Sequence, residues 1–249
     1  MRTDYLVSLP EFQELFIELM IGDGVGYLIQ KENMVMGYAI HNGEGVLIEF
    51  YVKDQYLPDS QEAFKQVIKE LAIQEVFCKS FDALLLNACL QSTFSYSLVG
   101  VLYRDYSGPK IQKERGIEMR PSGFASVNLL LNQDESIREL FETEQQLTHF
   151  IEHEHVFEFY KNEELIGCGM VLRTNAEWDF CDLGVWVHPQ KRGHSLGAQI
   201  LLLLREFALE NHMKPSCGCD IENIASQMTI EKCGFGSKHK LISFASRPN

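Results

Sequence analysis

A pattern of predicted strands and helices occurs twice along this chain, and this repetition constrains its fold more than any other feature. Residues 27–40 align without a gap against residues 157–170, with Gly37 on Gly167 in the return strand of a predicted hairpin. In both halves a strand, a helix, a strand, a helix and a last strand follow. Unrelated α/β segments can give similar strings, but agreement in order and periodicity over several elements favours an internal repeat.

The second half predicts three helices and five strands. Its first helix is expected to begin at an N-cap Ser136, and its last helix to begin at Asn223 and end at Gly234. Between them, apolar residues at a period of 3.6 predict a helix from about Ser195 to Glu210. The expected helices cover 136–152, 195–210 and the segment after 223; the expected strands are 156–160, 165–172, 182–188, 216–220 and a last one.

The first half predicts the same order. A helix is expected after Asp59, which forms a capping box with Glu62, and a second helix over 82–90. Strands are expected at 46–52, 76–79 and 97–103. Turn residues cluster in the segment from Ser107 to Lys110, so this segment is the expected linker between a domain at 1–110 and a domain at 111–249. Alternating strands and helices imply an α/β fold with mixed, partly parallel sheets covered on both faces.

Composition restricts the partners and the compartment. A net charge of −13 argues against nucleic acid as a partner and favours a cationic small molecule such as an amine. The start of the chain has no signal-peptide pattern, and no apolar run is long enough to span a membrane, so a cytoplasmic location is expected. The seven cysteines lie mostly in apolar, strand-like runs and are expected to be reduced and unpaired.

A short basic loop between a strand and a helix is the main candidate site. It contains Lys191, Arg192, Gly193 and His194 and opens directly into the helix near Leu196. Free N–H groups at a helix N-terminus bind anions, and a glycine lets phosphates approach the backbone. A tight turn also needs glycine for steric reasons, so the loop alone is a weak signal.

Two motifs in the right order make the signal more specific. Residues 187–198 resemble the pyrophosphate motif of the GNAT superfamily of N-acetyltransferases, in which Val-x-Pro leads into Arg/Gln-x-x-Gly-x-Gly/Ala. Residues 223–226 and 231–235 resemble the second signature of that family, an Asn and a small residue followed by Glu-Lys-x-Gly-Phe. The resemblance is close in the second half of the chain and weak in the first half. It implies tandem GNAT-like domains, each with a mixed, mostly antiparallel sheet that has a parallel central pair.

The resemblance also implies a set of residues that bind acetyl-CoA. Main-chain amides would hold the pyrophosphate, a strand edge would pair with the pantetheine arm, and the last helix would contact the distal part of the cofactor. The amides are those of Arg192, Gly193, His194, Ser195, Gly197 and Ala198; the strand edge is at Val185 and Val187; the helix residues are Asn223 and Ser226. The structural alternatives are that the two valines are core residues and that Asn223 is only an N-cap.

Two positions depart from the family pattern. Ser195 stands where the motif has its first glycine, so its backbone must adopt a conformation open to a residue with a Cβ, or be strained. A serine is an acceptable helix cap, and its hydroxyl adds a donor. Ile230 stands where many members carry a tyrosine as general acid. Since a thiol with a pKa of about 8.5 is a fair leaving group, this loss need not abolish transfer.

Carboxylates near the strand at 182–188 are the candidate general bases. They are Glu177, Asp179 and Asp182. Asp179 shares side-chain parity with Val185 and Val187, whereas Asp182 does not, and a bulge would reverse this preference. A solvated acidic loop is the alternative for all three.

No metal site is expected. The spacing of His153, Glu154 and His155 suits a metal, but a histidine cluster at a helix end is more often solvated. Cys217 and Cys219 share one face of a strand without a second ligand pair. Cys181 is expected to be a buried strand cysteine.

These features favour an acetyl-CoA-dependent N-acetyltransferase that acts on a small amine, a metabolite or an amino-containing antibiotic. The architecture resembles the zwittermicin A resistance type. The alternative is a non-catalytic acyl-CoA-binding sensor or scaffold, which Ile230 favours. A dinucleotide-binding domain is disfavoured, since no Gly-x-Gly-x-x-Gly follows an early strand. The glycine-free connection Lys53–Asp59 predicts that the first half does not bind the cofactor. The acceptor and the acyl chain length stay open, and a homodimer is compatible with the sequence.

Overall fold

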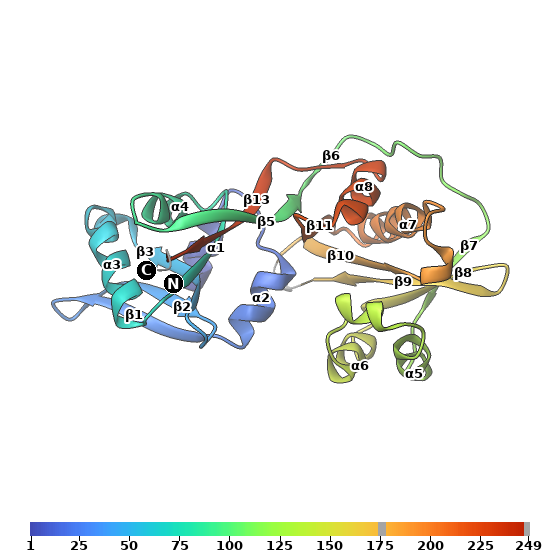
Figure 1. The fold of residues 1–249 in the computed structure, drawn as a ribbon, viewed down its shortest axis with the longest axis horizontal. Helices are drawn as coiled ribbons and strands as arrows, with labels where there is room; N and C mark the ends of the chain where they lie inside the picture. Colours follow the sequence, from blue (N-terminus) through green and yellow to red (C-terminus); the bar gives the residue numbers. More distant parts are fainter. Residues whose placement is uncertain (174–177, 247–249) are drawn as a thin grey trace. The chain divides into compact units, whose positions relative to one another are not determined.

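The computed structural model describes residues 1–173 and 178–246, and its chain divides into two compact units (Figure 1). The first unit comprises Met1–Leu102, Gly218–Glu222 and His239–Asn249. The second comprises Tyr103–Cys217 and Asn223–Lys238. The boundary near residue 102 lies close to the expected linker, but the last strand of the chain belongs to the first unit, whereas the sequence pattern predicted it in the domain at 111–249.

The first unit contains helices on a mixed sheet. Its helices are α1 (Arg2–Ser8), α2 (Leu15–Gly22), the 3-10 helix η1 (Asp54–Asp59), α3 (Ser60–Glu70) and α4 (Ala83–Leu90). Its strands are β1 (Val25–Lys31), β2 (Met34–His41), β3 (Val46–Val52), β4 (Glu75–Lys79), β5 (Ser95–Tyr103) and β13 (His239–Ala245).

The strand order in the first unit is β1-β2-β3-β4-β13-β5. Within this order β3 and β4 pair in parallel, and the other four described pairs are antiparallel. The C-terminal strand β13 lies between β4 and β5 and pairs with both. A core of apolar side chains from β2, β3, β4, α3 and α4 packs around Phe50, Phe64 and Leu85.

The second unit has the same kinds of element. Its helices are α5 (Ala125–Leu131), η2 (Glu135–Glu139), α6 (Glu144–Glu152), η3 (Pro189–Lys191), α7 (Leu196–Glu210) and α8 (Ile224–Lys232). Its strands are β6 (Asp105–Tyr106), β7 (Ile117–Pro121), β8 (Val156–Lys161), β9 (Glu164–Leu172), β10 (Phe180–Val187), β11 (Lys214–Asp220) and β12 (Phe235–Gly236); the division between the units falls within β11.

The strands of the second unit follow the order β11-β10-β9-β8-β7, with one parallel pair, β10 and β11. Helices α7 and α8 lie on one side of this sheet and α5 and α6 on the other (Figure 1). Gly167 and Gly169 leave room on the α7 face for Ile200 and Leu204. On the opposite face, Leu140 fills the space above Gly184. This layering confirms the expected mixed α/β fold with helices on both faces.

Strand register shows that the two halves repeat each other. Gly37 pairs with Val52 of β3, and Gly167 pairs with Val187 of β10. In each hairpin a β-bulge lies at the same aligned position, after Ile29 in the first and after Phe159 in the second. A Cβ on either glycine would collide with a backbone carbonyl of the neighbouring strand, that of Tyr51 or of Trp186. The gapless sequence alignment therefore corresponds to equivalent positions in three dimensions.

One predicted helix start and one predicted capping interaction are wrong. The segment expected to form one helix from Ser136 contains η2 and a separate helix α6, which begins after Thr143, whose hydroxyl accepts from the Gln146 amide. Asp59 makes no side-chain cap on α3, because its carboxylate pairs with Lys31 at 2.8 Å. In both cases the side chain expected to cap the helix has a partner far away in sequence. The Ser136 hydroxyl accepts from Arg192, and the Asp59 carboxylate pairs with Lys31.

The expected linker is tied to the last helix of the second unit. The Ser107 amide donates to the Gly234 carbonyl at 2.9 Å, and the Lys110 amide donates to the Lys232 carbonyl at 2.8 Å. Gly234 has a φ of +99°, and a Cβ there would collide with the Gly108 carbonyl. The predicted glycine stop of α8 is therefore confirmed and also serves to admit the linker.

A buried carboxylate anchors the first helix of the first unit. Glu49 on β3 is fully buried. It accepts hydrogen bonds from Tyr38 Oη at 2.9 Å, from Gln13 Nε2 at 2.8 Å and from Arg2 Nη2 at 3.1 Å. A buried carboxylate is stable only when its oxygens are paired in this way, so the network fixes α1 on the sheet.

All seven cysteines are free thiols, and six of them are buried, as expected. No helix in the described part of the chain is both long and apolar enough to cross a membrane.

Candidate functional site

Strands β10 and β11 pair only at their beginnings. In the described residues their parallel ladder covers Phe180 to Asp182 of β10 and ends at the pair Asp182 and Ser216. The other edge of β10 stays paired with β9 as far as Val187. From Leu183 onward, β10 therefore has one edge with no ladder partner in this part of the chain.

The backbone groups of Val185 point to this open edge. The His188 amide donates to Ile166 on β9 at 3.0 Å, so even-numbered residues of β10 face β9. The carbonyl oxygen of Cys181 accepts from the Ser216 hydroxyl on β11, so odd-numbered residues face the other way. Because the N–H and C=O of one strand residue share an edge and alternate along the strand, those of Val185 are free to pair with an extended ligand.

Val185 and Val187 are both half-buried, so neither is a fully buried core residue. The Val187 carbonyl lies on the same open edge, but it accepts from Arg192 Nε at 3.1 Å. The two predicted strand residues thus differ: Val185 presents both backbone groups, whereas the carbonyl of Val187 is used to hold the loop.

The loop between β10 and α7 presents free amides. The amides of Gly193, His194 and Ser195 have no acceptor among the hydrogen bonds of the described residues. Those of Arg192 and Ala198 donate to the carbonyls of Pro189 and Ser195. The amide of Gly197 is in the first turn of α7, where intrahelical partners are lacking. Four of the six predicted amides are therefore available to an anion.

Side chains hold this loop in place from outside. Arg192 Nη2 donates to the Ser136 hydroxyl at 2.7 Å, and Trp186 Nε1 donates to the same oxygen at 3.0 Å. Lys191 pairs with Glu164 at 2.5 Å, and this ion pair lowers the pKa of Glu164. Ser136 was predicted only as a helix cap. Its contacts with Trp186 and Arg192 could not be predicted, because they join residues about fifty positions apart.

Ser195 has a left-handed backbone, with φ 58° and ψ 15°. Its hydroxyl makes no cap to α7. Of the two possibilities for Ser195, the strained backbone is the one observed. The prediction that its side chain caps the helix is wrong. Gly193 has a φ of +81°, so two left-handed residues shape the loop. Successive amides in such turns converge on one point and form an anion-binding concavity.

Gly197 lets α7 begin close to its neighbours. A Cβ at this position would lie 3.1 Å from Thr229 Cγ2 of α8 and 3.3 Å from Val187 Cγ2 of β10. The N-terminus of α7 is thereby held near the end of the open β10 edge. The two elements that could bind an elongated ligand, a strand edge and a set of amides, are continuous along the chain.

The last helix contributes a capped start and an apolar interior. Asn223 Oδ1 accepts from the Ser226 amide at 3.0 Å, so its predicted N-cap role is confirmed. Ile230 is buried, and it is the one buried residue of α8. The side chain of Ile230 has no hydroxyl, unlike the tyrosine that the family resemblance would place here.

The candidate bases differ in their surroundings. Asp179 precedes β10, is largely exposed and lies 3.6 Å from Lys214 Nζ. Asp182 is half-buried within β10 and shares its face with Gly184 and Trp186. The register is continuous from Asp182 to Val187, so no bulge reverses the parity in this stretch. Glu177 lies outside the described residues.

Two buried cysteines, Cys181 and Cys233, are unsuited to nucleophilic chemistry. Burial raises the pKa of Cys181 to about 12 and that of Cys233 to about 12, so both stay protonated near neutral pH.

Two sequence families match the chain, one in each half. The family described as "Acetyltransferase (GNAT) domain" matches residues 1–106, and the family described as "Acetyltransferase (GNAT) family" matches residues 124–235. Comparison with curated proteins gave no match.

Three solved structures share the fold over most of the chain. An acetyltransferase of the GNAT family from Colwellia psychrerythraea has a TM-score of 0.87 at 19% identity, covering 99% of this chain and 94% of its own. A tandem GNAT protein from the clavulanic acid biosynthesis pathway has a TM-score of 0.63 at 11% identity, covering 99% and 94%. A GCN5-related N-acetyltransferase from Sphaerobacter thermophilus has a TM-score of 0.62 at 11% identity, covering 90% and 81%. At these identities the similarity shows the fold.

Proposed function

Since the chain belongs to the GNAT superfamily of acetyltransferases and carries two such domains in tandem, we propose that its second unit binds acetyl-CoA and acetylates the amine of a small molecule. The observation that carries this proposal is the continuity of the open β10 edge with the loop amides. Val185 offers a donor and an acceptor to an extended arm, and Gly193, His194 and Ser195 offer donors to a pyrophosphate.

The reaction needs little from side chains once the thioester is held. The amine nitrogen attacks the thioester carbonyl carbon, a C–N bond forms, and the C–S bond breaks as the thiolate leaves. The amine proton passes to a base, for which Asp182 and Asp179 are the described candidates. Asp182 lies on the strand itself and is partly shielded from water. Ile230 offers no proton to the departing sulfur, and this observation favours the alternative of a non-catalytic acyl-CoA sensor or scaffold.

The first unit is not expected to bind acetyl-CoA, although its strands β3 and β4 also pair in parallel only at their beginnings. The position of the glycine loop is taken by η1, which contains Pro58 and ends at the carboxylate of Asp59. Proline removes a donor, and carboxylates repel a pyrophosphate. The unit retains the repeated fold without the anion site.

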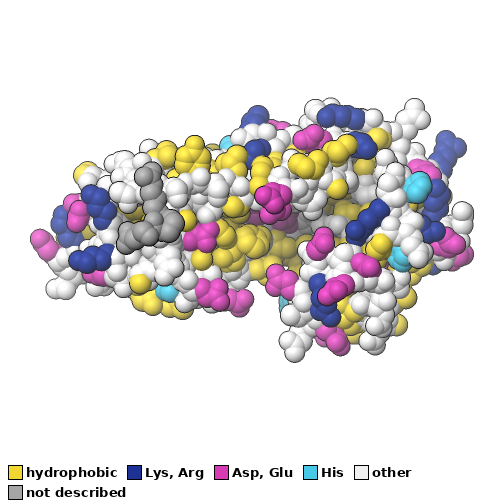
Figure 2. Space-filling view, in the orientation of Figure 1, with side chains coloured by type: hydrophobic (Ala, Val, Ile, Leu, Met, Phe, Trp, Pro, Cys, Tyr) yellow, Lys and Arg dark blue, Asp and Glu magenta, His cyan; other side chains and the backbone are white. Residues whose placement is uncertain are grey.

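The acceptor is proposed to be a cationic amine rather than a nucleic acid. The chain carries a net charge of −13, and Asp and Glu side chains are spread over the face shown in Figure 2. Such a surface raises the local concentration of cations. The resemblance to the zwittermicin A resistance type, the cytoplasmic location and a homodimer stay predictions.

Binding can be tested with two matched glycine variants. Gly193 and Gly116 both have a φ of +81° and open space at the Cβ position, so alanine imposes the same backbone cost at each. Only Gly193→Ala should weaken acetyl-CoA binding in a calorimetric titration. Equal affinity of Gly193→Ala, Gly116→Ala and the unchanged protein would refute the anion site.

Catalysis needs a separate measurement. Thiol release from acetyl-CoA in the presence of a panel of small amines should be detected and should fall in Asp182→Asn or in Asp179→Asn, whichever is the base. Acetyl-CoA binding without thiol release for any amine would instead support the sensor or scaffold. NAD should not stabilise the protein.

A further inference from the structure

Three potential metal ligands meet on the last turns of α6. His149, Glu152 and His153 are exposed, and their ligand atoms all lie within 4.8 Å of one another. Positions three and four apart on a helix project from the same side, which explains the convergence. The ring centroids of the two histidines are 4.3 Å apart.

One of these histidines is already oriented as a ligand. Nδ1 of His153 lies 2.8 Å from the His149 carbonyl oxygen. Because a carbonyl oxygen only accepts hydrogen bonds, the proton of the neutral imidazole lies on Nδ1, and Nε2 is the nitrogen with the lone pair. Metal-bound histidines typically donate their second ring N–H to such an acceptor, which fixes the tautomer and the ring orientation.

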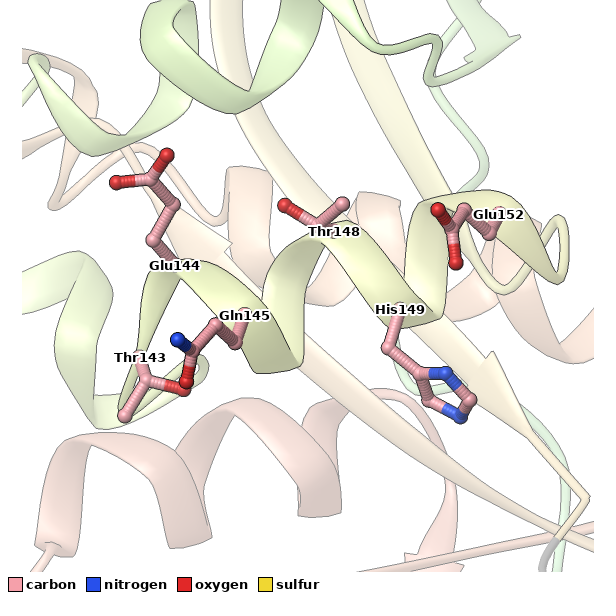
Figure 3. A pocket seen from close by; sticks show the side chains of 6 residues that line it. All are labelled: Thr143, Glu144, Gln145, Thr148, His149 and Glu152. Carbon is pink, nitrogen blue, oxygen red and sulfur yellow. The ribbon is translucent and has the colours of Figure 1, made fainter.

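The cluster adjoins a hollow on the surface of α6. The hollow has a volume of about 590 Å³, and two of the cluster residues, His149 and Glu152, line it (Figure 3). The other lining residues are Thr143, Glu144, Gln145 and Thr148. A second carboxylate, Glu144, adds negative charge to the same helix.

We propose that His149, Glu152 and His153 bind one divalent transition-metal ion such as Zn²⁺ or Ni²⁺. Two imidazoles and one carboxylate suit these ions, whereas Ca²⁺ and Mg²⁺ prefer oxygen ligands. Three protein ligands leave coordination positions for water or for a donor atom of a molecule in the hollow. The site is independent of the proposed acetyl transfer.

This set differs from the one that the sequence singled out. The spacing that suits a metal in the sequence is that of His153, Glu154 and His155, where no metal was expected. Glu154 lies beyond the end of α6 and has a left-handed backbone, with a φ of 58°. The helical spacing of His149, Glu152 and His153 was the signal that could have found the cluster, since a helix that ends at Glu152 was already predicted.

Titration of the tag-free, full-length chain with NiCl₂ by calorimetry at pH 7.5 tests the proposal. Ni²⁺ is the first probe because Zn²⁺ also binds thiolates. We expect one ion per chain. His149→Gln and His153→Gln should each weaken binding by about tenfold or more, since even outer-shell substitutions cost about 10–100-fold.

Glu154→Gln is the matched control. It removes the same charge as Glu152→Gln two residues further along the chain, beyond the end of α6, and it leaves the three ligands intact. Its affinity should equal that of the unchanged protein, whereas Glu152→Gln should weaken binding. Thermal unfolding without metal checks that all variants fold. An absence of binding at millimolar NiCl₂, or an affinity that His149→Gln leaves unchanged, would overturn the proposal.

Discussion

Ser195→Gly tests whether the cofactor loop is strained. Ser195 has a φ of 58°, is exposed, and makes no side-chain cap to α7. A residue with a Cβ pays about 1–2 kcal/mol in the left-handed region, which glycine avoids. Glycine also gains about 0.4–1 kcal/mol of conformational freedom in the unfolded chain, which opposes the effect. No buried contact and no cap are lost, so the net gain in stability should be about 0.5–1 kcal/mol.

Thermal unfolding measures this gain. For a chain of this size it corresponds to a rise in Tm of about 1–4 °C. Ser195→Ala is the control, because it removes the hydroxyl and keeps the Cβ; its Tm should not rise. A Tm for Ser195→Gly at or below that of Ser195→Ala would refute the argument from backbone strain.

Acetyl-CoA titrations on the same variants separate strain from ligand contact. If the loop acts through its amides, Ser195→Ala should bind acetyl-CoA as tightly as the unchanged protein. A similar loss of affinity in Ser195→Ala and Ser195→Gly would instead show that the serine hydroxyl contacts the cofactor.

Three further predictions concern other parts of the chain. Ile230→Tyr should raise kcat by about 100-fold over Ile230→Phe, the low end of what a positioned acid contributes, and steady-state kinetics on both variants would show equal rates if no acid is needed. Burial and its histidine neighbours hold the pKa of His155 below 6.5, so the folded chain keeps it neutral while the unfolded chain takes up a proton. The free energy of unfolding should therefore fall as pH drops through 6.5, and the fall should be smaller in His155→Phe. Urea unfolding across this range measures both, and an equal fall in the two proteins would contradict the argument. Glu49→Ala should destabilise the protein by about 3–5 kcal/mol in urea unfolding, because Arg2 and Tyr38 lose a fully buried partner, and a loss below 1 kcal/mol would mean that water replaces the carboxylate.

Much of the local structure follows from the sequence. The hairpin turn, the period-3.6 stripe of α7, the Asn223 cap and the Gly234 stop depend on residues within a few positions of one another. The repeat was also visible, because Gly37 and Gly167 sit where any Cβ would strike a neighbouring strand. Such steric requirements act through residue identity and therefore appear in the sequence.

Other features were decided by tertiary contacts. Strand β13 inserts between β4 and β5, Ser136 holds Arg192 and Trp186, and Asp59 pairs with Lys31 instead of capping α3. Each contact joins residues far apart in the chain. A polar side chain can pair with many residues of the same type, and only the fold decides which of them lies within reach.

The sequence by itself determined a repeated α/β pattern and a single glycine-containing anion loop, because turns, caps and close approaches are set by neighbouring residues. Only the tertiary structure decided that β10 leaves Val185 unpaired beside that loop, because this depends on where the pairing of β10 with β11 ends.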